Sequence, residues 1–253
     1  MTQAQLTILT GASRGMGLAM ATQLCRADAL LLCISRSTSA TLESLARERG
    51  TTLVQWPADL SDAADVAARL QAWLRGQDVA QLASATLINN AGMVGRLGPL
   101  DPALPADVAT TLRVDLEAPV QLSAAFLTAT RDWVLPKKIL NISSGLGRRA
   151  MAGGSLYCAA KAGMDHFSRC VALDEARQAH GTRIVSLAPG VIDTDMQTDL
   201  RAGDPARFPD GAGFVQLKET GMLTSPGDAA ARVLAYLARA DFGAQPVADV
   251  RDA

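Results

Sequence analysis

Tyr157 and Lys161 stand four residues apart in a stretch, residues 155–161, whose composition favours a helix. Positions i and i+4 of a helix share one face, so the phenol and the ammonium point the same way. A free phenol loses its proton at about pH 10, which makes it a poor acid or base in a cell. A positive charge within about 4–6 Å favours phenolate, so we expect Lys161 to lower the pKa of Tyr157 toward the working range of acid–base catalysis.

Ser144 precedes Tyr157 by thirteen residues and follows an apolar run that predicts the end of a strand. A hydroxyl at this place can donate to a carbonyl oxygen while the tyrosine protonates that oxygen. The three side chains therefore predict one half of a hydride-transfer site, whose other half is a nicotinamide pocket. For an isolated Tyr–Lys pair the alternative is an interfacial tyrosine beside a surface lysine, so the other motifs of the chain are needed to decide.

A glycine-rich turn, GASRGMG at residues 11–17, joins an apolar run at residues 6–10 to a stretch of helical composition at residues 18–27. Glycines let backbone N–H groups approach a pyrophosphate closely, and the N-terminus of the following helix adds positive potential. A strand, a glycine turn and a helix in this order predict a phosphate site.

Arg36 follows the second apolar run, residues 29–35, at the place that decides between the two nicotinamide dinucleotides. A pocket for NAD usually carries an acid about 20 residues past the glycines, where it binds the ribose 2′-hydroxyl. This chain has Arg36 there and no acid, and a guanidinium is well shaped for a phosphate. We expect Arg36 and Arg14 to bind the 2′-phosphate of NADP(H); the alternative is that both are solvated surface residues.

Strand-like and helix-like stretches alternate along the whole chain. Predicted strands are residues 6–10, 29–35, 51–56, 85–88, 138–142 and 183–187, with a further candidate at 245–250. Predicted helices are residues 18–27, 41–49, 61–74, 106–131 with an interruption at Pro119, 155–178 and 226–240. This order predicts the α/β class: a single doubly wound parallel sheet, the Rossmann fold, with helices on both faces and residues 1–253 forming one domain. Residues 193–225 read as a long irregular connection, and we expect them to form a lid over the substrate.

The overall composition argues against several classes of partner. The net charge is −1 and 49% of the residues are hydrophobic, which gives no reason to expect nucleic acid or an anionic membrane surface. The sequence shows neither a leader peptide nor a membrane span. The four cysteines show no metal-binding spacing, so we expect no metal, and small buried thiols in a reducing cytoplasm are the expected interpretation.

Five motifs together resemble the short-chain dehydrogenases/reductases: TGASRGMG at 10–17, NNAG at 89–92, Ser144, YCAAK at 157–161 and PGVIDT at 189–194. They occur in the order and spacing of that family and cover nearly the whole chain. The resemblance implies that Ser144, Tyr157 and Lys161 are catalytic. The family has an asparagine where this chain has Asp115, and that residue is understood to bind a relay water largely through its main-chain carbonyl. We therefore include Asp115 as a fourth catalytic residue.

The resemblance also implies a set of NADP(H) contacts drawn from all five motifs and from the residues after the second and third strands. They are Gly11, Ser13, Arg14, Gly15, Met16, Gly17, Arg36, Asp59, Asn89, Ala91, Gly92, Tyr157, Lys161, Pro189, Gly190, Ile192 and Thr194. Members of this family usually assemble through their long helices, so we expect a homodimer or homotetramer.

Three segments, residues 193–197, 214–218 and 249–252, resemble the sepiapterin reductase and benzil reductase branch of the family. That branch is NADPH-linked and reduces vicinal dicarbonyls. The resemblance implies a substrate pocket formed by Leu146, Met151, Met196, Phe214 and Asp249. Asp249 would bind the guanidine-like edge of a pterin; the alternative is a solvated terminal carboxylate. We expect an NADPH-dependent carbonyl reductase that transfers hydride to a ketone or vicinal dicarbonyl.

Two other functions compete with this one. Residues 11–15 also fit GxSxG, the nucleophile elbow of serine hydrolases, with Ser13 as nucleophile and His166 or His180 further along the chain. However, several strands normally precede that elbow, and a hydrolase explains neither the Tyr–Lys pair nor Gly17. The second alternative is an NADP-binding sensor that has the same fold but does not turn over, and the departure at Asp115 leaves that reading open.

Overall fold

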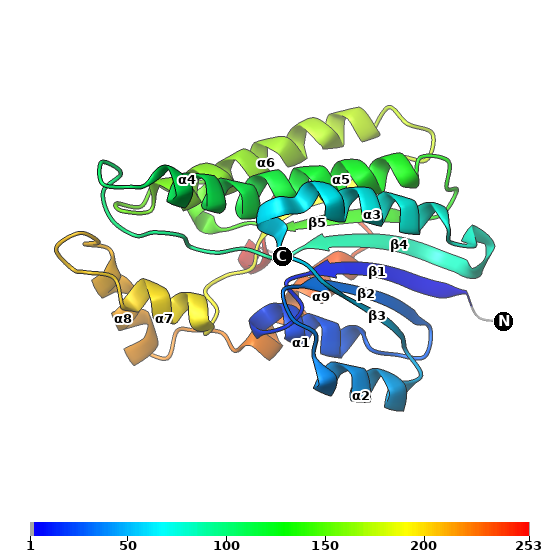
Figure 1. Ribbon diagram of the computed structural model, residues 1–253, viewed down its shortest axis with the longest axis horizontal. Helices are drawn as coiled ribbons and strands as arrows, with labels where there is room; N and C mark the ends of the chain where they lie inside the picture. Colours follow the sequence, from blue (N-terminus) through cyan, green and yellow to red (C-terminus); the bar gives the residue numbers. More distant parts are fainter. Residues whose placement is uncertain (1–2, 253) are drawn as a thin grey trace.

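A computed structural model describes residues 3–252, in which seven strands form one parallel sheet (Figure 1). The strands are β1 (Ala4–Thr10), β2 (Ala29–Ser35), β3 (Thr52–Pro57), β4 (Leu82–Asn89), β5 (Lys137–Ile142), β6 (Arg183–Ala188) and β7 (Val247–Asp249). Their order in the sheet is β3-β2-β1-β4-β5-β6-β7. The expected fold class is confirmed, and β7 confirms the further strand expected near the end of the chain.

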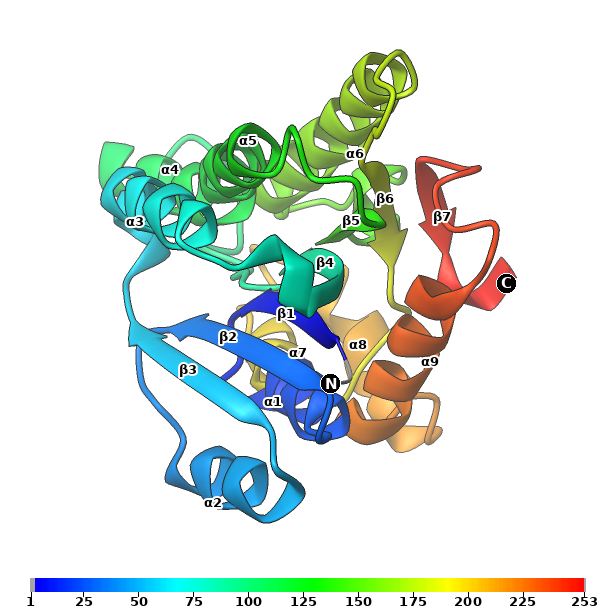
Figure 2. The ribbon, with the colours of Figure 1, turned by 90° about the vertical axis from the view of Figure 1, so that its right-hand side faces the viewer.

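Helices cover both faces of the sheet (Figures 1 and 2). One layer holds α1 (Gly15–Leu24), α2 (Ala40–Arg49) and α9 (Pro226–Ala238), and the other holds α3 (Ala63–Arg75), α4 (Pro105–Leu112), α5 (Ala118–Ala129) and α6 (Ser155–Glu175). The sheet is therefore buried on both faces, which is why its strands are almost continuous runs of apolar residues rather than alternating ones.

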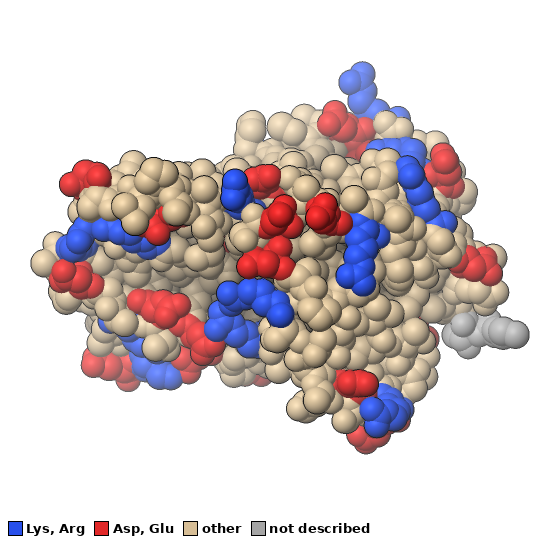
Figure 3. All heavy atoms as spheres, viewed as in Figure 1, with Lys and Arg blue, Asp and Glu red and all other residues tan. Residues whose placement is uncertain are grey.

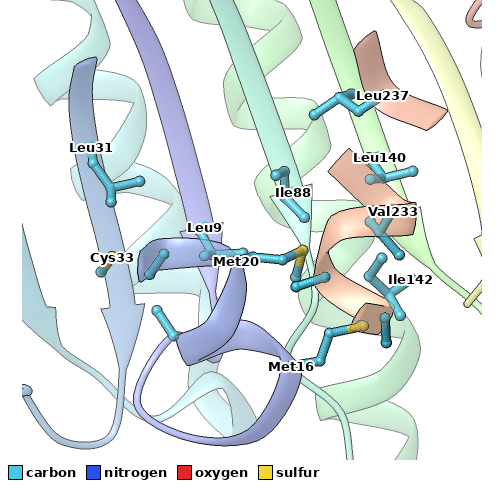
Figure 4. Packing of buried hydrophobic residues seen from close by; sticks show 14 of the residues in the cluster. Leu9, Met16, Met20, Leu31, Cys33, Ile88, Leu140, Ile142, Val233 and Leu237 are labelled. Carbon is cyan, nitrogen blue, oxygen red and sulfur yellow. The ribbon is translucent and has the colours of Figure 1, made fainter. Parts of the chain in front are cut away.

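Apolar side chains packed between the sheet and helices α1 and α9 hold the glycine turn in place. Met16 and Met20 of α1 are buried, and they pack with Leu9 of β1, Ile88 of β4 and Val233 of α9 in one apolar cluster (Figure 4). Met20, Leu9, Ile88 and Val233 are fully buried. Because α1 is held to the sheet through these side chains, its N-terminus and the turn before it have a fixed position relative to β1 and β4.

A π-helical turn, Arg113–Glu117, lies between α4 and α5, just before Pro119. In an α-helix the carbonyl of Asp115 would bond to the amide of residue 119, but proline has no N–H and its ring crowds that carbonyl. The amide of Ala118 bonds instead to the carbonyl of Arg113, five residues back. The sequence prediction of an interruption at Pro119 is thus refined: the helical path continues, and one extra residue is accommodated in the turn before the proline.

Two short helices, α7 (Asp195–Arg201) and α8 (Gly211–Glu219), lie within residues 193–225, so the expected irregular connection is wrong over these spans. They lie beyond the carboxyl ends of the strands (Figure 1). Neither is long enough to be stable by propensity alone, and tertiary packing of an apolar face must stabilise them. Phe208 supplies that contact: it is 1% exposed and stacks on Phe214 of α8 with the ring centroids 6.0 Å apart.

Acidic and basic side chains alternate on the face shown in Figure 3, where no region of a single sign dominates. None of the helices in residues 3–252 is both long and apolar enough to cross a membrane.

Candidate active site

A cleft of about 930 Å³ opens at the carboxyl ends of the strands, where β1 and β4 lie side by side and the strand order reverses. In open parallel sheets this reversal is where ligands bind, because the connections on its two sides leave in opposite directions and part from each other. The volume is at the upper end of the range for small-molecule sites, about 300–1,000 Å³.

The glycine turn forms one wall of the cleft, and its glycines have physical reasons to be there. Gly11 has φ of +68°, a conformation that residues with a Cβ rarely adopt. A Cβ on Gly17 would lie 2.0 Å from the carbonyl oxygen of Gly11 and 2.5 Å from Asn90 Nδ2. The turn and the start of α1 therefore approach each other so closely that only glycine fits at position 17. The backbone of the turn is exposed to the cleft.

Asn90, which the sequence analysis did not select, holds this turn in place. Its Nδ2 donates to the carbonyl oxygens of Thr10 at 3.0 Å and Gly11 at 3.2 Å. Asn89, which was selected, does not line the cleft; it is 2% exposed, and its Nδ2 donates to Asn141 Oδ1 at 2.8 Å. Neighbouring residues of a strand point to opposite sides, so only one of the two asparagines can face the cleft. Which one does so depends on where β4 ends, and the NNAG motif does not show that.

Ser144, Tyr157 and Lys161 all line the cleft next to this turn. Tyr157 and Lys161 share a face of α6, with Lys161 Nζ 5.5 Å from the centroid of the tyrosine ring. Lys161 Nζ donates to the carbonyl oxygen of Ile142 at 3.1 Å, and the side chain of Ser144 is hydrogen-bonded to Tyr157. Tyr157 is thus connected to Ser144, and Lys161 to the last residue of β5.

The pKa of Tyr157 is raised, not lowered, so the expected effect of Lys161 is wrong in this structure. Burial of the phenol is the largest cause, since it penalises the charged form, and the negative charge of Asp115 is the second. The hydrogen bond with Ser144 acts in the opposite direction. A raised pKa keeps the phenol protonated at neutral pH, which is the form that donates a proton.

Asp115 lies one layer behind the wall of the cleft, in the π-helical turn, and is fully buried. Its Oδ1 accepts a hydrogen bond from the amide of Met93 at 2.8 Å, whereas its Oδ2 is buried without a partner among the described residues. A methyl group on Gly92 would lie 3.1 Å from Asp115 Oδ1 and 3.5 Å from Lys161 Nζ. Burial raises the pKa of Asp115, and the charge of Lys161 partly opposes that rise.

The two arginines selected from the sequence, Arg36 and Arg14, also line the cleft. Arg36 follows β2 and is exposed. The pKa of Asp59 is lowered, first by the hydrogen bond of its carboxylate with Ser61 and to a smaller extent by the charge of Arg36. Arg14 Nη1 forms an ion pair of 2.9 Å with Asp195 at the start of α7. Both arginines line the cleft, so the two candidates lie beside the same space.

Most of the other residues selected from the sequence also line the cleft. They are Gly11, Ser13, Gly15, Met16, Gly17, Asp59, Ala91, Gly92, Pro189, Gly190, Ile192 and Thr194 around the expected dinucleotide, and Leu146, Met196 and Phe214 in the expected substrate region. The exceptions are Asn89, Asp115, Met151 and Asp249, which do not line it.

Met151 and Asp249 are each occupied by other contacts. Met151 is 5% exposed and packs in the small apolar cluster with Val94, Leu200 and Phe208. The two carboxylate oxygens of Asp249 accept hydrogen bonds from Arg251 Nε at 2.8 Å and Nη2 at 2.6 Å. The proposed pterin contact of Asp249 therefore has a cation already bound to it, and it is Arg251 that lines the cleft.

Several other residues that line the cleft were not among the site residues predicted from the sequence. These are Asn90, Val94, Arg149, Leu200, Leu217 and Arg251. Leu200 and Leu217 lie on α7 and α8, whose existence was not predicted, and Val94 and Arg149 belonged to no motif. Asn90 had a signal as the second member of the NNAG motif, and Leu217 and Arg251 belong to the segments 214–218 and 249–252 that carry the branch resemblance.

The residues present fit a dinucleotide in one specific respect. A Cβ at position 17 would collide with Gly11, so the turn keeps its shape only with glycine there. In this shape the backbone of the turn is exposed, and a phosphate can approach the N–H groups at the start of α1. The hydroxyl of Ser35, at the end of β2, accepts a hydrogen bond from the amide of Ala12 at 2.8 Å and so connects the turn to the strand that Arg36 follows.

The fold and this site define an oxidoreductase of the short chain dehydrogenase family: the family model for short chain dehydrogenases matches residues 5–205, and the chain belongs to that family. The family uses nicotinamide cofactors. The chain is 35% identical over 219 residues to benzil reductase ((S)-benzoin forming) of Bacillus cereus, covering 87% of this chain and 88% of that protein. It is 34% identical to sepiapterin reductase of Meriones unguiculatus, covering 93% and 92%. Among solved structures, a short-chain dehydrogenase/reductase from Burkholderia vietnamiensis is 37% identical, with coverage of 98% and 99% and a TM-score of 0.63.

Proposed function

We propose that this protein is an NADPH-dependent carbonyl reductase whose preferred substrates are vicinal dicarbonyls with apolar substituents, as in benzil. The observation that carries the proposal is that Ser144, Tyr157 and Lys161 all lie in the wall of one cleft, next to a glycine turn that exposes its backbone. The benzil and sepiapterin reductases to which the chain is similar support the same reaction class.

The proposed chemistry divides into a hydride and a proton. Bound NADPH supplies the hydride to the carbonyl carbon. Tyr157, a phenol that is protonated at neutral pH, gives its proton to the carbonyl oxygen, and Ser144 donates a hydrogen bond that stabilises the developing negative charge. Lys161, held by the carbonyl of Ile142, keeps a positive charge next to the tyrosine as the phenol loses its proton.

Pro119 assigns a role to the backbone of Asp115 in the same site. Because residue 119 has no N–H, the carbonyl of Asp115 lacks the amide that an α-helix would place on it. We propose that this carbonyl accepts a hydrogen bond from a water that resupplies the proton through Lys161. Asp115 then takes the place of the family's asparagine through its main chain, although its side chain differs.

The preference for NADPH rests on Arg36 and Arg14. An arginine pair at one end of the cleft, with an exposed guanidinium on Arg36, suits a phosphate better than a hydroxyl. Arg14 also reaches Asp195 of α7, so the same side chain connects the dinucleotide end of the cleft with residues 193–225. We propose that these residues are a lid, and that Met196 and Phe214 contact the substrate from it.

A diaryl or alkyl diketone suits the substrate region better than a pterin does. Leu146, Met196 and Phe214 give an apolar lining, whereas Asp249, the carboxylate proposed for a pterin, is bound by Arg251 through both of its oxygens. A carboxylate that is already paired has to give up a charge-assisted contact before it binds a pterin. This places benzil-like compounds ahead of sepiapterin among the proposed substrates.

Of the two alternative functions, the hydrolase has no base in reach. His166 and His180 are exposed, and neither lines the cleft with Ser13. A sensor would bind NADPH but would not oxidise it, so only a turnover measurement distinguishes it from the enzyme.

The proposal also includes a cytoplasmic location, which the four free cysteines favour, and a homodimer or homotetramer.

The test is an NADPH-oxidation screen against benzil, other 1,2-diketones, sepiapterin and simple ketones. We expect turnover with benzil, and loss of turnover by at least about 10³-fold in Tyr157→Phe with NADPH binding retained, because the proton donor is removed and the ring is kept. Tyr236→Phe is the matched control, since Tyr236 is a buried tyrosine of α9 that does not line the cleft. Quenching of NADPH fluorescence without oxidation by any carbonyl compound would establish the sensor instead.

A further inference from the structure

The inward face of α6 carries buried polar side chains beyond the two that line the cleft. Asp165 and Ser168 follow Lys161 by four and then three residues, which keeps all three on one face of the helix. Asp165 is 1% exposed and Ser168 is fully buried. The reaction described above uses neither of them, yet burying a carboxylate costs several kcal/mol unless it is well bonded.

Each member of this row bonds to the last residues of β5 or to the residue that follows it. The contacts are Lys161 Nζ to Ile142 O at 3.1 Å, Ser143 Oγ to Asp165 Oδ1 at 2.6 Å and Asn141 Nδ2 to Ser168 Oγ at 3.0 Å. Apolar packing tolerates sliding of a helix along a strand, whereas hydrogen bonds are directional and weaken steeply when misaligned. The row therefore fixes the register of α6 against β5.

Asp165 is the centre of this network. Its Oδ1 accepts from Ser143 Oγ and from Ser186 Oγ of β6, both at 2.6 Å, and its Oδ2 accepts from Arg148 Nε at 3.0 Å. Arg148 Nη2 in turn donates to the carbonyl of Ala248 in β7 at 2.9 Å. One carboxylate thus joins the helix that carries Tyr157 to β6, to β7 and to the residue directly before Ser144. Bonds of this kind are short and strong because the acceptor is charged.

We propose that Asp165 is a positioning residue, which holds Ser143 so that the neighbouring Ser144 meets the oxygen that Tyr157 protonates. This inference rests on the proposed function. Tyr157 lies eight residues before Asp165 on the same helix, and both hydroxyls must come within about 2.6–3.2 Å of one oxygen atom. A misplacement of about 1 Å in such a site lowers the rate by about 10²-fold. Asp165 stands on the helix that carries Tyr157 and accepts the hydrogen bond of Ser143, so it sets the position of Ser144 relative to the phenol.

The network offers a matched pair of variants, Ser143→Ala and Ser186→Ala. Each removes one hydroxyl from the same carboxylate oxygen, at the same distance, and leaves the other hydroxyl and Arg148 in place. We expect kcat with benzil to fall by about 10-fold or more in Ser143→Ala, with KM and the Kd for NADPH changed less than about twofold. In Ser186→Ala we expect kcat within about twofold of the original chain. Equal values of kcat in the two variants would show that Asp165 only stabilises the fold.

A double-mutant cycle with Ser144→Ala gives a second, independent comparison. Asp165→Asn keeps the volume of the side chain and removes its charge, and we expect it to lower kcat by about 10-fold in the original chain. In the Ser144→Ala background we expect Asp165→Asn to change kcat less than about twofold, because no serine hydroxyl remains to be misplaced. The same loss in both backgrounds overturns the proposal. If Asp165→Asn does not fold, the two serine variants decide.

Crystal structures of the serine variants test the proposal without turnover, so that its failure and that of the proposed function are distinguishable. We expect Ser144 Oγ to move by more than about 0.5 Å relative to Tyr157 in Ser143→Ala, and not in Ser186→Ala. An unmoved Ser144 in both overturns the positioning role. Absence of dicarbonyl reduction by the original chain overturns the proposed function instead.

Discussion

Asp115 Oδ1 and Lys161 Nζ approach one point behind the wall of the cleft, 3.1 Å and 3.5 Å from where a methyl group on Gly92 would lie. A carboxylate and an ammonium so close to one position influence each other and the phenol of Tyr157. The burial of Asp115 favours its neutral form, while Lys161 favours the charged one. Two predictions concern this balance.

The first is a pH dependence of stability. Burial raises the folded-state pKa of Asp115 above its ordinary value of about 3.9. Stability from such a group is fully present below the unfolded pKa and is lost as pH rises through the folded pKa. We therefore expect the Tm to fall from about pH 4 upward by this contribution, and Asp115→Asn to remove it, so that the variant gains most at the higher pH values. Thermal melts at a series of pH values measure this, and Asp62→Asn, which makes the same chemical change on an exposed side chain, is the control for the substitution itself.

The second prediction concerns the rate of reduction. As pH rises through the raised pKa of Asp115, its carboxylate places a negative charge near Tyr157 and opposes the phenolate that forms when the proton is given away. We expect kcat for benzil to decline as pH rises through the titration of Asp115, and Asp115→Asn to remove that decline. Identical pH profiles for the two proteins would mean that the Asp115 side chain does not titrate in the working enzyme.

Gly17→Ala is expected to block the dinucleotide. The added methyl group would lie 2.0 Å from the carbonyl oxygen of Gly11, so the turn must move and its N–H groups lose their positions. We expect the Kd for NADPH, measured by fluorescence titration, to rise at least 10-fold, about 1.4 kcal/mol. Gly213→Ala in α8 is the control: a Cβ there meets nothing within 4 Å, so binding stays unchanged and stability rises by up to about 1 kcal/mol.

Arg36→Asp is expected to change the choice of cofactor. A hydrogen bond to a charged group contributes about 1.5–3 kcal/mol, so the ratio of kcat/KM for NADPH to that for NADH is expected to fall by about 10- to 100-fold. Arg47→Asp makes the same charge change on α2, outside the cleft, and is expected to leave the ratio within about twofold. An equal fall in both variants would point to the general field of the protein instead of a contact at Arg36.

Phe214→Ala tests the lid. The ring lines the cleft and stacks on Phe208, so truncation removes an apolar surface from the proposed substrate region and leaves Ser144, Tyr157 and Lys161 unchanged. We expect KM for benzil to rise by about 5- to 30-fold, corresponding to about 1–2 kcal/mol, with kcat within about twofold. The neighbouring Val215→Ala alters an exposed side chain that does not line the cleft, and KM is expected to stay unchanged. A fall in kcat with KM unchanged would instead place Phe214 in the chemical step.

Features defined by local backbone chemistry could be predicted from the sequence. The glycine turn is specified by residues that alone permit its geometry, and the apolar runs that became β1, β4 and β5 have no alternative to burial in a covered sheet. Tyr157 and Lys161 were placed on one helix face by their spacing alone, and they lie there.

Features defined by distant contacts could not be predicted. Helices α7 and α8 depend on the packing around Phe208, and no local sequence pattern indicates that packing. The choice between Asn89 and Asn90 depends on where β4 ends, and the state of Asp249 depends on Arg251, two residues on, folding back to it. The pKa of Tyr157 depends on its burial and on Asp115, forty-two residues away in the chain, so the spacing of Tyr157 and Lys161 could not reveal its direction.

Because of the extra residue in the turn before Pro119, one continuous helical segment faces the cleft with its first half and the apolar core with its second half. Each residue of an α-helix turns the chain by about 100°, so one inserted residue rotates α4 relative to α5 by roughly that amount. Thr110 and Val114 consequently face the cleft, while Ala118, Leu122 and Phe126 remain in the core beside α3. Substitutions on the first half can then reshape the entrance for a different ketone, and the second half is free to keep the packing on which folding depends.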